Sequence, residues 1–137
     1  MELADTSAWT VRRRDPDLNR RFLERMADGV IATCPLVMME LLWTARDVDE
    51  LAIMRVGLEA LPQIPIDEPV WRRAIEVLEL LAGDGPLHHR RVTPPDLLIA
   101  AAAERAGVAV LHYDRDFELI ADTTGQSVRS IAPLGSL

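Results

Sequence analysis

Four acidic side chains in this chain lie within or directly beside apolar segments. Asp5 lies in Leu-Ala-Asp-Thr-Ser, Glu40 in Met-Met-Glu-Leu-Leu, Asp96 in Pro-Pro-Asp-Leu-Leu and Asp114 in His-Tyr-Asp-Arg-Asp. A carboxylate buried without a partner is strongly unfavourable, and several that converge repel each other unless a cation neutralises them. Ligand sets made only of oxygen suit Mg²⁺ or Mn²⁺. We therefore expect a divalent-metal site, and a metal ion with water indicates phosphoryl or phosphodiester chemistry.

Each of these acids also has a simpler interpretation when it is taken alone. Asp96 follows Pro95 in the first turn of an expected helix, where an acid complements the helix dipole. Asp5 fits a cap or a surface position equally well. Glu40 is the least expected, because Met and Leu residues surround it in a helical segment. The pattern alone does not establish that the four side chains meet.

The acids are positioned by an alternation of short β-type runs and helical segments. Glycines precede two of the runs and are typical of the ends of helices. Strands are expected at 3–4, 30–32, 64–66, 108–111 and 127–131. Helices are expected at 16–26, 35–43, 47–60, 67–82, 96–106 and 116–121, with a long polar loop at 83–92.

This alternation predicts an α/β fold, with a central parallel sheet flanked by helices in three layers. Open sheets of this kind bind ligands beyond the carboxyl ends of their strands. Asp5 and Asp114 each follow an expected strand, so we expect both at that edge of the sheet.

Length and composition predict one domain over residues 1–137, with ordinary apolar (49%) and charged (27%) fractions. We expect no membrane-spanning segment and no secretory signal, and the single Cys34 favours a reducing cytoplasm. The net charge of −7 argues against a protein that coats nucleic acid non-specifically. It does not exclude a nuclease, because a metal ion inverts the local field at an acidic cluster.

All fifteen basic side chains are arginines, and two groups of them stand out. The run His88-His89-Arg90-Arg91 precedes Asp96; contact with RNA phosphate and a solvated loop are equally good interpretations. Arg12 to Arg14 are expected to form a solvated face. The three tryptophans are expected in core or interface packing, and Cys34 is expected to be buried.

The order of four segments resembles the PIN-domain ribonucleases, most closely the VapC-type toxins of VapBC toxin–antitoxin pairs. The matching segments are Asp-Thr-Ser-Ala-Trp at 5–9, Met-Glu-Leu-Leu-Trp at 39–43, Pro-Pro-Asp-Leu-Leu-Ile-Ala-Ala at 94–101 and Leu-His-Tyr-Asp-Arg-Asp-Phe at 111–117. Each segment is weakly specific, whereas the four in this order are strongly specific. The resemblance spans residues 3 to about 131.

The resemblance implies an endoribonuclease toxin that uses Mg²⁺ or Mn²⁺ to hydrolyse RNA. Its catalytic and metal-binding acids correspond to Asp5, Glu40, Asp96 and Asp114, with Asp116 as an accessory metal ligand. His112 stands where many members carry Thr or Ser, so a contact with metal-bound water and a loop histidine without a role both remain open. Thr6 and Ser7 are assigned either to positioning a phosphate or to capping a helix. The resemblance also implies homodimers and a cognate VapB-type antitoxin whose C-terminal segment covers the acidic pocket.

Two other functions fit parts of the pattern. A PIN-like module without activity would bind RNA or a partner only, but the presence of all four acids speaks against it. An aspartyl-phosphate phosphatase or dehalogenase also begins with Leu-x-Asp. Such proteins usually have a second acid two residues later and a downstream lysine, whereas this chain has Ser7 and no lysine.

Overall fold

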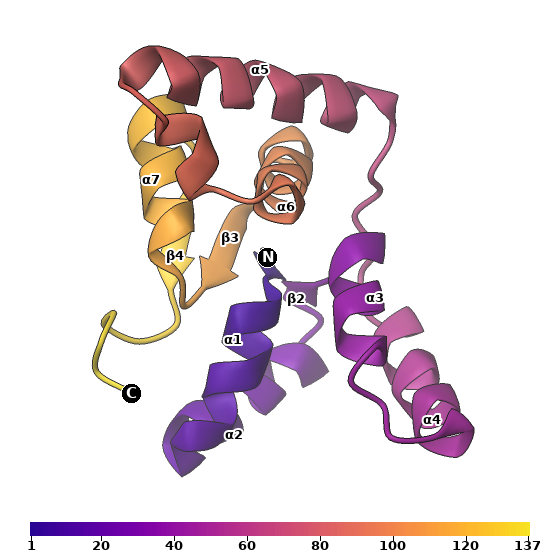
Figure 1. Cartoon of the computed structure of the whole chain (residues 1–137). Helices are drawn as coiled ribbons and strands as arrows, with labels where there is room; N and C mark the ends of the chain where they lie inside the picture. The colour runs from indigo at the N-terminus through magenta and orange to yellow at the C-terminus, as the bar shows by residue number, and fades with distance from the viewer.

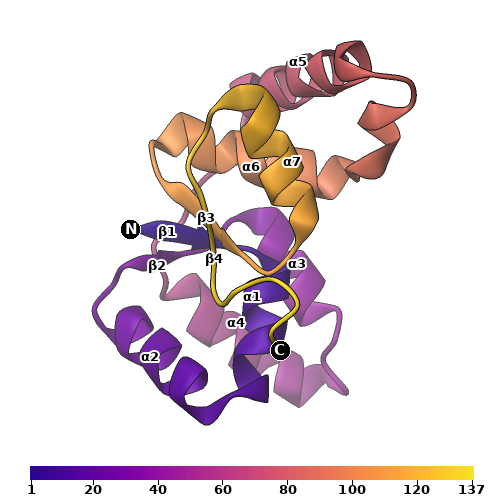
Figure 2. The ribbon, with the colours of Figure 1, turned by 90° about the vertical axis from the view of Figure 1, so that its left-hand side faces the viewer.

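A four-stranded parallel sheet forms the centre of the molecule, with its strands in the order β2–β1–β3–β4. The computed structural model describes all 137 residues. The strands are β1 (Glu2–Ala4), β2 (Ile31–Ala32), β3 (Ala109–His112) and β4 (Val128–Ser130). Leu3 of β1 pairs with Ala32 on one side and with Val110 on the other. Figures 1 and 2 show helices on both sides of this sheet, which confirms the expected three-layer α/β fold.

Seven α-helices and two short 3-10 turns complete the fold. The helices are α1 (Thr6–Val11), α2 (Pro16–Ala27), α3 (Pro35–Leu42), α4 (Val48–Glu59), α5 (Glu68–Asp84), α6 (Pro94–Ala106) and α7 (Arg115–Thr124). The 3-10 turns are η1 (Arg12–Arg14) and η2 (His88–Arg91). Helices α5, α6 and α7 lie on one side of the sheet and α1 and α2 on the other, while α3 and α4 form a pair beside them (Figures 1 and 2).

Helix starts follow from local chemistry. Asp15, Asp47 and Asp67 each accept a backbone N–H from the first turn of the following helix, which satisfies a donor that the helix itself leaves free. Proline occupies the first turn of α2, α3, α5 and α6, where its missing N–H costs nothing. Helix α6 ends at Gly107, whose φ of 71° belongs to the left-handed region that glycine adopts freely.

Helix α6 is the most deeply buried helix, with every residue from Leu97 to Ala103 buried. Its four consecutive alanines allow α5 to pack closely on it, and α5 turns Val70, Ala74, Val77 and Leu81 inward. This packing fixes the first turn of α6, which carries Asp96. None of the helices combines the length and the apolar character needed to cross a membrane.

The prediction of a strand at 64–66 is wrong. The chain beside β2 forms one isolated bridge, between Thr33 and Gln63, and Ile64 donates its N–H to the Thr33 carbonyl at 2.8 Å. Pro65 has no N–H to donate, so the ladder does not continue. The expected loop at 83–92 is also more regular than predicted, because α5 extends to Asp84 and η2 occupies 88–91.

The expectation of a solvated Arg12 is wrong as well. Arg12 is 8% exposed, and its guanidinium lies over the rings of Trp9 and Phe22, at 5.3 and 5.1 Å from the ring centroids. Arg13 and Arg14 are exposed as predicted. Of the tryptophans, Trp9 is buried, whereas 87% of Trp43 is exposed. Cys34 is fully buried, as expected.

Candidate active site

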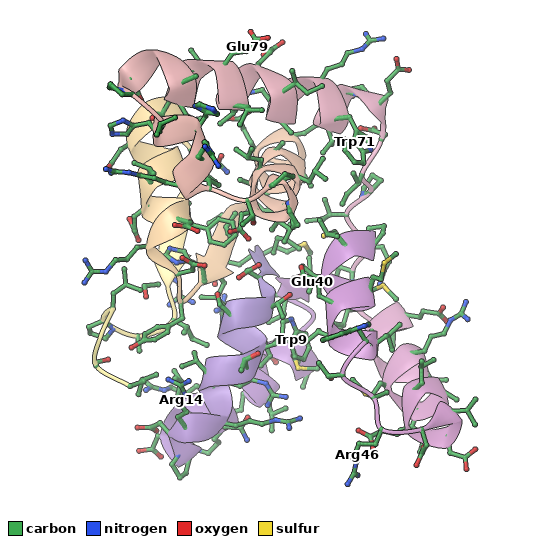
Figure 3. All side chains as sticks on the ribbon, in the orientation of Figure 1. Trp9, Arg14, Glu40, Arg46, Trp71 and Glu79 are labelled. Atoms are coloured by element: carbon green, nitrogen blue, oxygen red, sulfur yellow. The ribbon has the colours of Figure 1, made fainter.

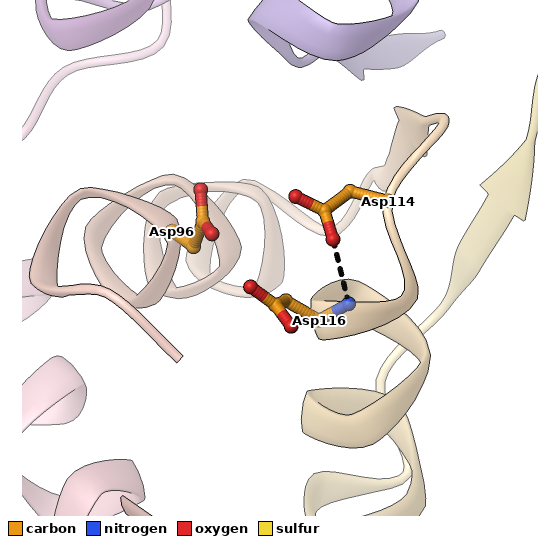
Figure 4. A group of neighbouring side chains, drawn as sticks. All are labelled: Asp96, Asp114 and Asp116. Carbon is orange, nitrogen blue, oxygen red and sulfur yellow. Dashed lines mark hydrogen bonds between the residues drawn. The ribbon is translucent and has the colours of Figure 1, made fainter. Parts of the chain in front are cut away.

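Two of the acidic side chains lie where β3 ends and α7 begins. Asp114 caps α7, and its Oδ1 accepts the backbone N–H of Asp116 at 2.9 Å. This turn places two carboxylates on neighbouring positions of one helix start, as Figure 4 shows. Partial burial raises the pKa of Asp116, and the negative charge of Asp114 raises it further.

Asp96 reaches the same place from the first turn of α6 (Figure 4). Asp96, Asp114 and Asp116 each offer a carboxylate oxygen, and these oxygens lie within 4.8 Å of one another. Burial, followed by the charges of Asp5 and Asp114, raises the pKa of Asp96 to about 7. Burial is the largest cause of this rise, and the neighbouring negative charges add to it because like charges disfavour the ionised form.

Asp5 lies at the carboxyl end of β1 and is almost fully buried. Its Oδ2 accepts two hydrogen bonds from Ser7, from the backbone N–H at 3.0 Å and from the hydroxyl at 2.6 Å. The Ser7 hydroxyl in turn accepts the N–H of Tyr113 at 2.9 Å, so it joins the start of α1 to the loop after β3. Burial raises the pKa of Asp5, the Ser7 hydrogen bonds oppose that rise, and the charge of Asp114 adds to it.

Glu40 extends from α3 toward the middle of the molecule, whereas Arg46 and Glu79 point outward (Figure 3). Its Oε1 is buried and has no hydrogen-bond partner, and the same holds for the Thr6 hydroxyl. Burial raises the pKa of Glu40, and the nearby charge of Asp5 raises it further. Asp5 and Glu40 therefore influence each other at the border of the pocket, outside the group of three carboxylates.

The chemistry of these donors fits a divalent cation. None of the five acids takes part in any of the ion pairs of the structure, so no arginine neutralises them. Three carboxylates at mutual ligand distance form a hard, oxygen-only set. Burial and the neighbouring negative charges both disfavour the ionised form of Asp96, and a cation bound at this place would favour that form.

Comparison with known proteins agrees with this geometry. The model of the PIN domain family matches residues 3–122. Ribonuclease VapC18 of Mycobacterium tuberculosis is 38% identical over 97% of this chain and 96% of its own length. Ribonuclease VapC51 of the same organism is 38% identical over 98% of this chain and 96% of its own length. The chain belongs to the PIN-domain family of VapC ribonucleases. DNA-bound VapBC from Salmonella typhimurium shares the fold, with a TM-score of 0.73 at 20% identity over 96% of this chain and all of the compared chain.

This PIN domain has a buried histidine two residues before its fourth acid. The Nδ1 atom of His112 accepts the N–H of Asp114 at 3.1 Å, so the neutral ring carries its proton on Nε2. Nε2 faces the Glu118 carboxylate at 3.1 Å. Burial lowers the pKa of His112, although the charge of Glu118 opposes that shift. His112 thus contacts the backbone that positions Asp114, and Glu118 is a contact that no sequence pattern indicated.

The set of acids that lies at ligand distance in the structure differs from the one that the sequence led us to expect. Asp116, expected as an accessory acid, is one of the three carboxylates at ligand distance, whereas Asp5 and Glu40 are not. The Asp-x-Asp spacing of Asp114 and Asp116 at the start of a helix could have indicated this group from the sequence. A capping residue and the residue two positions later face the same space.

A separate groove of about 430 Å³ lies on the PIN domain between α1, α3 and α4. Trp9, Leu41, Ile53 and Leu58 give it an apolar lining, and Thr6 links one end of it to the acidic pocket. Arg12 and Arg13 also line it.

Proposed function

We propose that this chain is the toxin of a type II toxin–antitoxin pair and a Mg²⁺-dependent endoribonuclease. The observation that carries the proposal is the group of three carboxylates without ion pairs, at the carboxyl ends of parallel strands in a VapC-type PIN domain. Mn²⁺ fits the same oxygen ligands.

In this proposal Asp96, Asp114 and Asp116 hold the cation. A bound divalent ion supplies Lewis-acid activation of water and neutralises charge that develops on the phosphate. Asp5 keeps Oδ1 free, because both hydrogen bonds from Ser7 go to Oδ2. Glu40, with its raised pKa, takes a proton more readily than an exposed glutamate does. Asp5 and Glu40 complete the catalytic set by orienting water and accepting its proton at the border of the pocket.

Hydrolysis by water at phosphorus needs no nucleophilic side chain, and it leaves 5′-phosphate and 3′-hydroxyl ends. The test is cleavage of RNA by the purified protein with Mg²⁺ or Mn²⁺, with and without excess EDTA, followed by mapping of the end chemistry. Asp116→Asn should abolish cleavage while the far-UV circular dichroism spectrum stays unchanged. Equal cleavage in EDTA would refute metal dependence. RNA binding without cleavage under any metal condition would favour the inactive PIN-like module instead.

We further propose a VapB-type antitoxin as the partner. Support comes from the fold shared with the VapBC complex of Salmonella typhimurium and from the apolar groove that begins beside Thr6. A segment of the antitoxin in this groove would reach the acidic pocket. Co-expression with the neighbouring antitoxin gene should relieve growth arrest and yield a stable complex.

A further inference from the structure

The arginines of this chain fall into two classes. Eight of them form ion pairs with nearby acids, namely Arg20, Arg25, Arg46, Arg55, Arg72, Arg73, Arg105 and Arg129. Arg90, Arg91 and Arg115 are exposed, have no ion pair, and lie on segments that lead into the acidic pocket. In a chain with a net charge of −7, unpaired arginines beside a group of carboxylates are unexpected from composition alone.

Seven arginines have no ion pair, and two of them, Arg90 and Arg91, are adjacent on η2, the turn that precedes α6. We call His88, His89, Arg90 and Arg91 the η2 basic cluster. The turn before it is tightly built, because a Cβ on Gly85 would lie 2.5 Å from the ring nitrogen Nδ1 of His88. Leu87, with φ of 61°, is the only residue other than glycine in the left-handed region. This local conformation ends α5 and lets η2 fold back against it.

The η2 basic cluster directly precedes the helix that carries Asp96. It ends at Arg91, and α6 begins at Pro94 and carries Asp96 in its first turn. Figure 2 shows the turn between α5 and α6 protruding on the side of the molecule where α6 begins. Two exposed, unpaired arginines therefore lie within six residues of Asp96 in the chain.

We propose that the η2 basic cluster binds backbone phosphates of the RNA substrate beside the cleavage site. This inference rests on the proposed function and adds the surface that holds the substrate. RNA brings one negative charge for each nucleotide toward five carboxylates, and a metal ion compensates this repulsion only at the scissile phosphate. The flanking phosphates need their own cations, and two adjacent guanidinium groups can each bind one through paired N–H donors. Such contacts position RNA without reading its sequence.

The observations favour RNA over an acidic protein segment as the occupant. The apolar groove that suits a protein partner lies between α1, α3 and α4, and no residue of η2 lines it. The η2 basic cluster itself consists of four side chains of basic type, and such a composition suits contact with nucleic acid.

The test compares the double variant Arg90→Gln/Arg91→Gln with the matched control Arg20→Gln/Arg21→Gln. Both pairs are adjacent and exposed, and both variants remove the same charge, but α2 lies far from η2 in Figure 2. Fluorescence anisotropy with a short labelled single-stranded RNA, in EDTA and over a series of salt concentrations, measures binding without cleavage. The η2 variant should bind roughly tenfold more weakly, and the slope of log K against log salt should become shallower by about 1.4. Arg90→Lys/Arg91→Lys should restore most of that slope.

Cleavage kinetics with Mn²⁺ provide the second readout. KM should rise about as much as Kd does for the η2 variant, with a much smaller change in kcat, while the control follows the wild type. RNA binding and salt slope equal to those of the control would overturn the inference. Weaker binding of a polyglutamate peptide with unchanged RNA binding would also overturn it and would assign the surface to an acidic protein. Because anisotropy needs no catalysis, failure of the proposed nuclease activity remains distinguishable from failure of this inference.

Discussion

Asp96 is the residue on which the electrostatics of the pocket depend most. Its pKa of about 7 lies far above the ordinary value of 3.8, because burial and the charges of Asp5 and Asp114 both disfavour its ionised form. The folded protein without metal therefore holds a proton on Asp96 that the unfolded chain releases at lower pH. Proton and cation compete for the same carboxylate.

The first prediction concerns the pH dependence that follows from this competition. Between about pH 4 and pH 7 the unfolded chain binds fewer protons at Asp96 than the folded chain, so the contribution of Asp96 to stability falls as pH rises. Asp96→Asn should remove this fall and make the metal-free protein more stable than the wild type at pH 8. Urea unfolding at several pH values in EDTA measures it.

Mn²⁺ provides the complementary measurement on the same variant. Wild-type affinity for Mn²⁺, measured by calorimetry, should increase with pH through about 7, and Asp96→Asn should bind at least tenfold more weakly. Glu40→Gln should show a smaller loss, because Glu40 lies outside the group of three carboxylates. Equal affinity and equal pH slope in Asp96→Asn and the wild type would remove Asp96 from the site.

At the scale of the elements, Ser7 joins two segments that are distant in sequence. Its hydroxyl donates to Asp5 and accepts the N–H of Tyr113, so it fixes the start of α1 against the loop between β3 and α7. Two acids of the site, Asp5 and Asp114, flank this link directly. The Ser7 hydroxyl thus adds a side-chain link to the backbone contacts between these segments, which include the hydrogen bond from the Asp5 N–H to the Leu111 carbonyl at 2.9 Å.

The second prediction is that Ser7→Ala lowers the free energy of unfolding by about 2 kcal/mol, since it removes a hydrogen bond to a carboxylate and frees a backbone N–H. It should also lower kcat. Thr10→Ala is the matched control on the same helix, because the exposed Thr10 hydroxyl bonds only to the Thr6 carbonyl. Chemical unfolding that gives equal losses for both variants would contradict the prediction.

Elements with strong local signals could be predicted from the sequence. Helices α2 and α5 combine a capping aspartate, a proline in the first turn and an apolar stripe, and the structure places both within two residues of the expected bounds. The six-residue α1 is too short for a helical period to define its ends. The wrong strand at 64–66 has a β-type composition, but the missing N–H of Pro65 decides against a ladder.

The candidate site could be predicted only in part for a related reason. Local sequence indicated the five acids as candidates, but which of them lie at ligand distance depends on how the elements that carry them pack together. The burial of Arg12 likewise depends on Trp9 and Phe22, whose rings meet at 4.9 Å only after α1 and α2 pack together. The grouping of the acids and the burial of Arg12 both depend on contacts between elements. The residue pattern within a single helix or strand does not predict such contacts.

At the scale of the whole molecule, Glu2 connects three parts of the fold. It accepts two hydrogen bonds from Arg129 of β4, both at 2.8 Å, and pairs with Arg25 of α2 at 2.5 Å. Burial alone would raise the pKa of Glu2, but the two guanidinium groups outweigh that effect and lower it. This network therefore stabilises the fold above the unfolded pKa of Glu2 and loses its effect as pH falls through the folded value.

The third prediction follows from this network. Glu2→Gln should destabilise the protein at pH 7 by about 2 kcal/mol, since it leaves two cations without a buried partner. The difference from the wild type should shrink as pH falls below about 4. Glu24→Gln, in an exposed pair with Arg20, should cost less than about 1 kcal/mol. Thermal unfolding of both variants over a pH series measures these losses of stability. A larger loss for Glu24→Gln than for Glu2→Gln would contradict the prediction.

The fourth prediction is that the protein forms a homodimer through α3 and α4. Met39, Trp43, Val48 and Val56 on these helices are between 68% and 87% exposed, which is a large apolar surface for a small domain. Trp43→Glu should give a monomer in sedimentation velocity, because a carboxylate would be buried in the interface. Leu23→Glu on α2 should leave the dimer intact. A wild type that sediments only as a monomer at micromolar concentration would refute the prediction.

The position of β1 has a consequence for the time at which activity arises during synthesis. β1 is made first, yet it lies in the interior of the sheet and pairs with β3, which is made near the end. Contacts this distant in sequence form late and slowly, because a long stretch of chain must first be closed into a loop. Asp5 of the acidic pocket follows the first strand, and Asp114 lies in the loop after β3. A ribosome that stalls before that loop therefore releases no active nuclease. The order of the strands thus delays assembly of the acidic pocket until translation is almost complete.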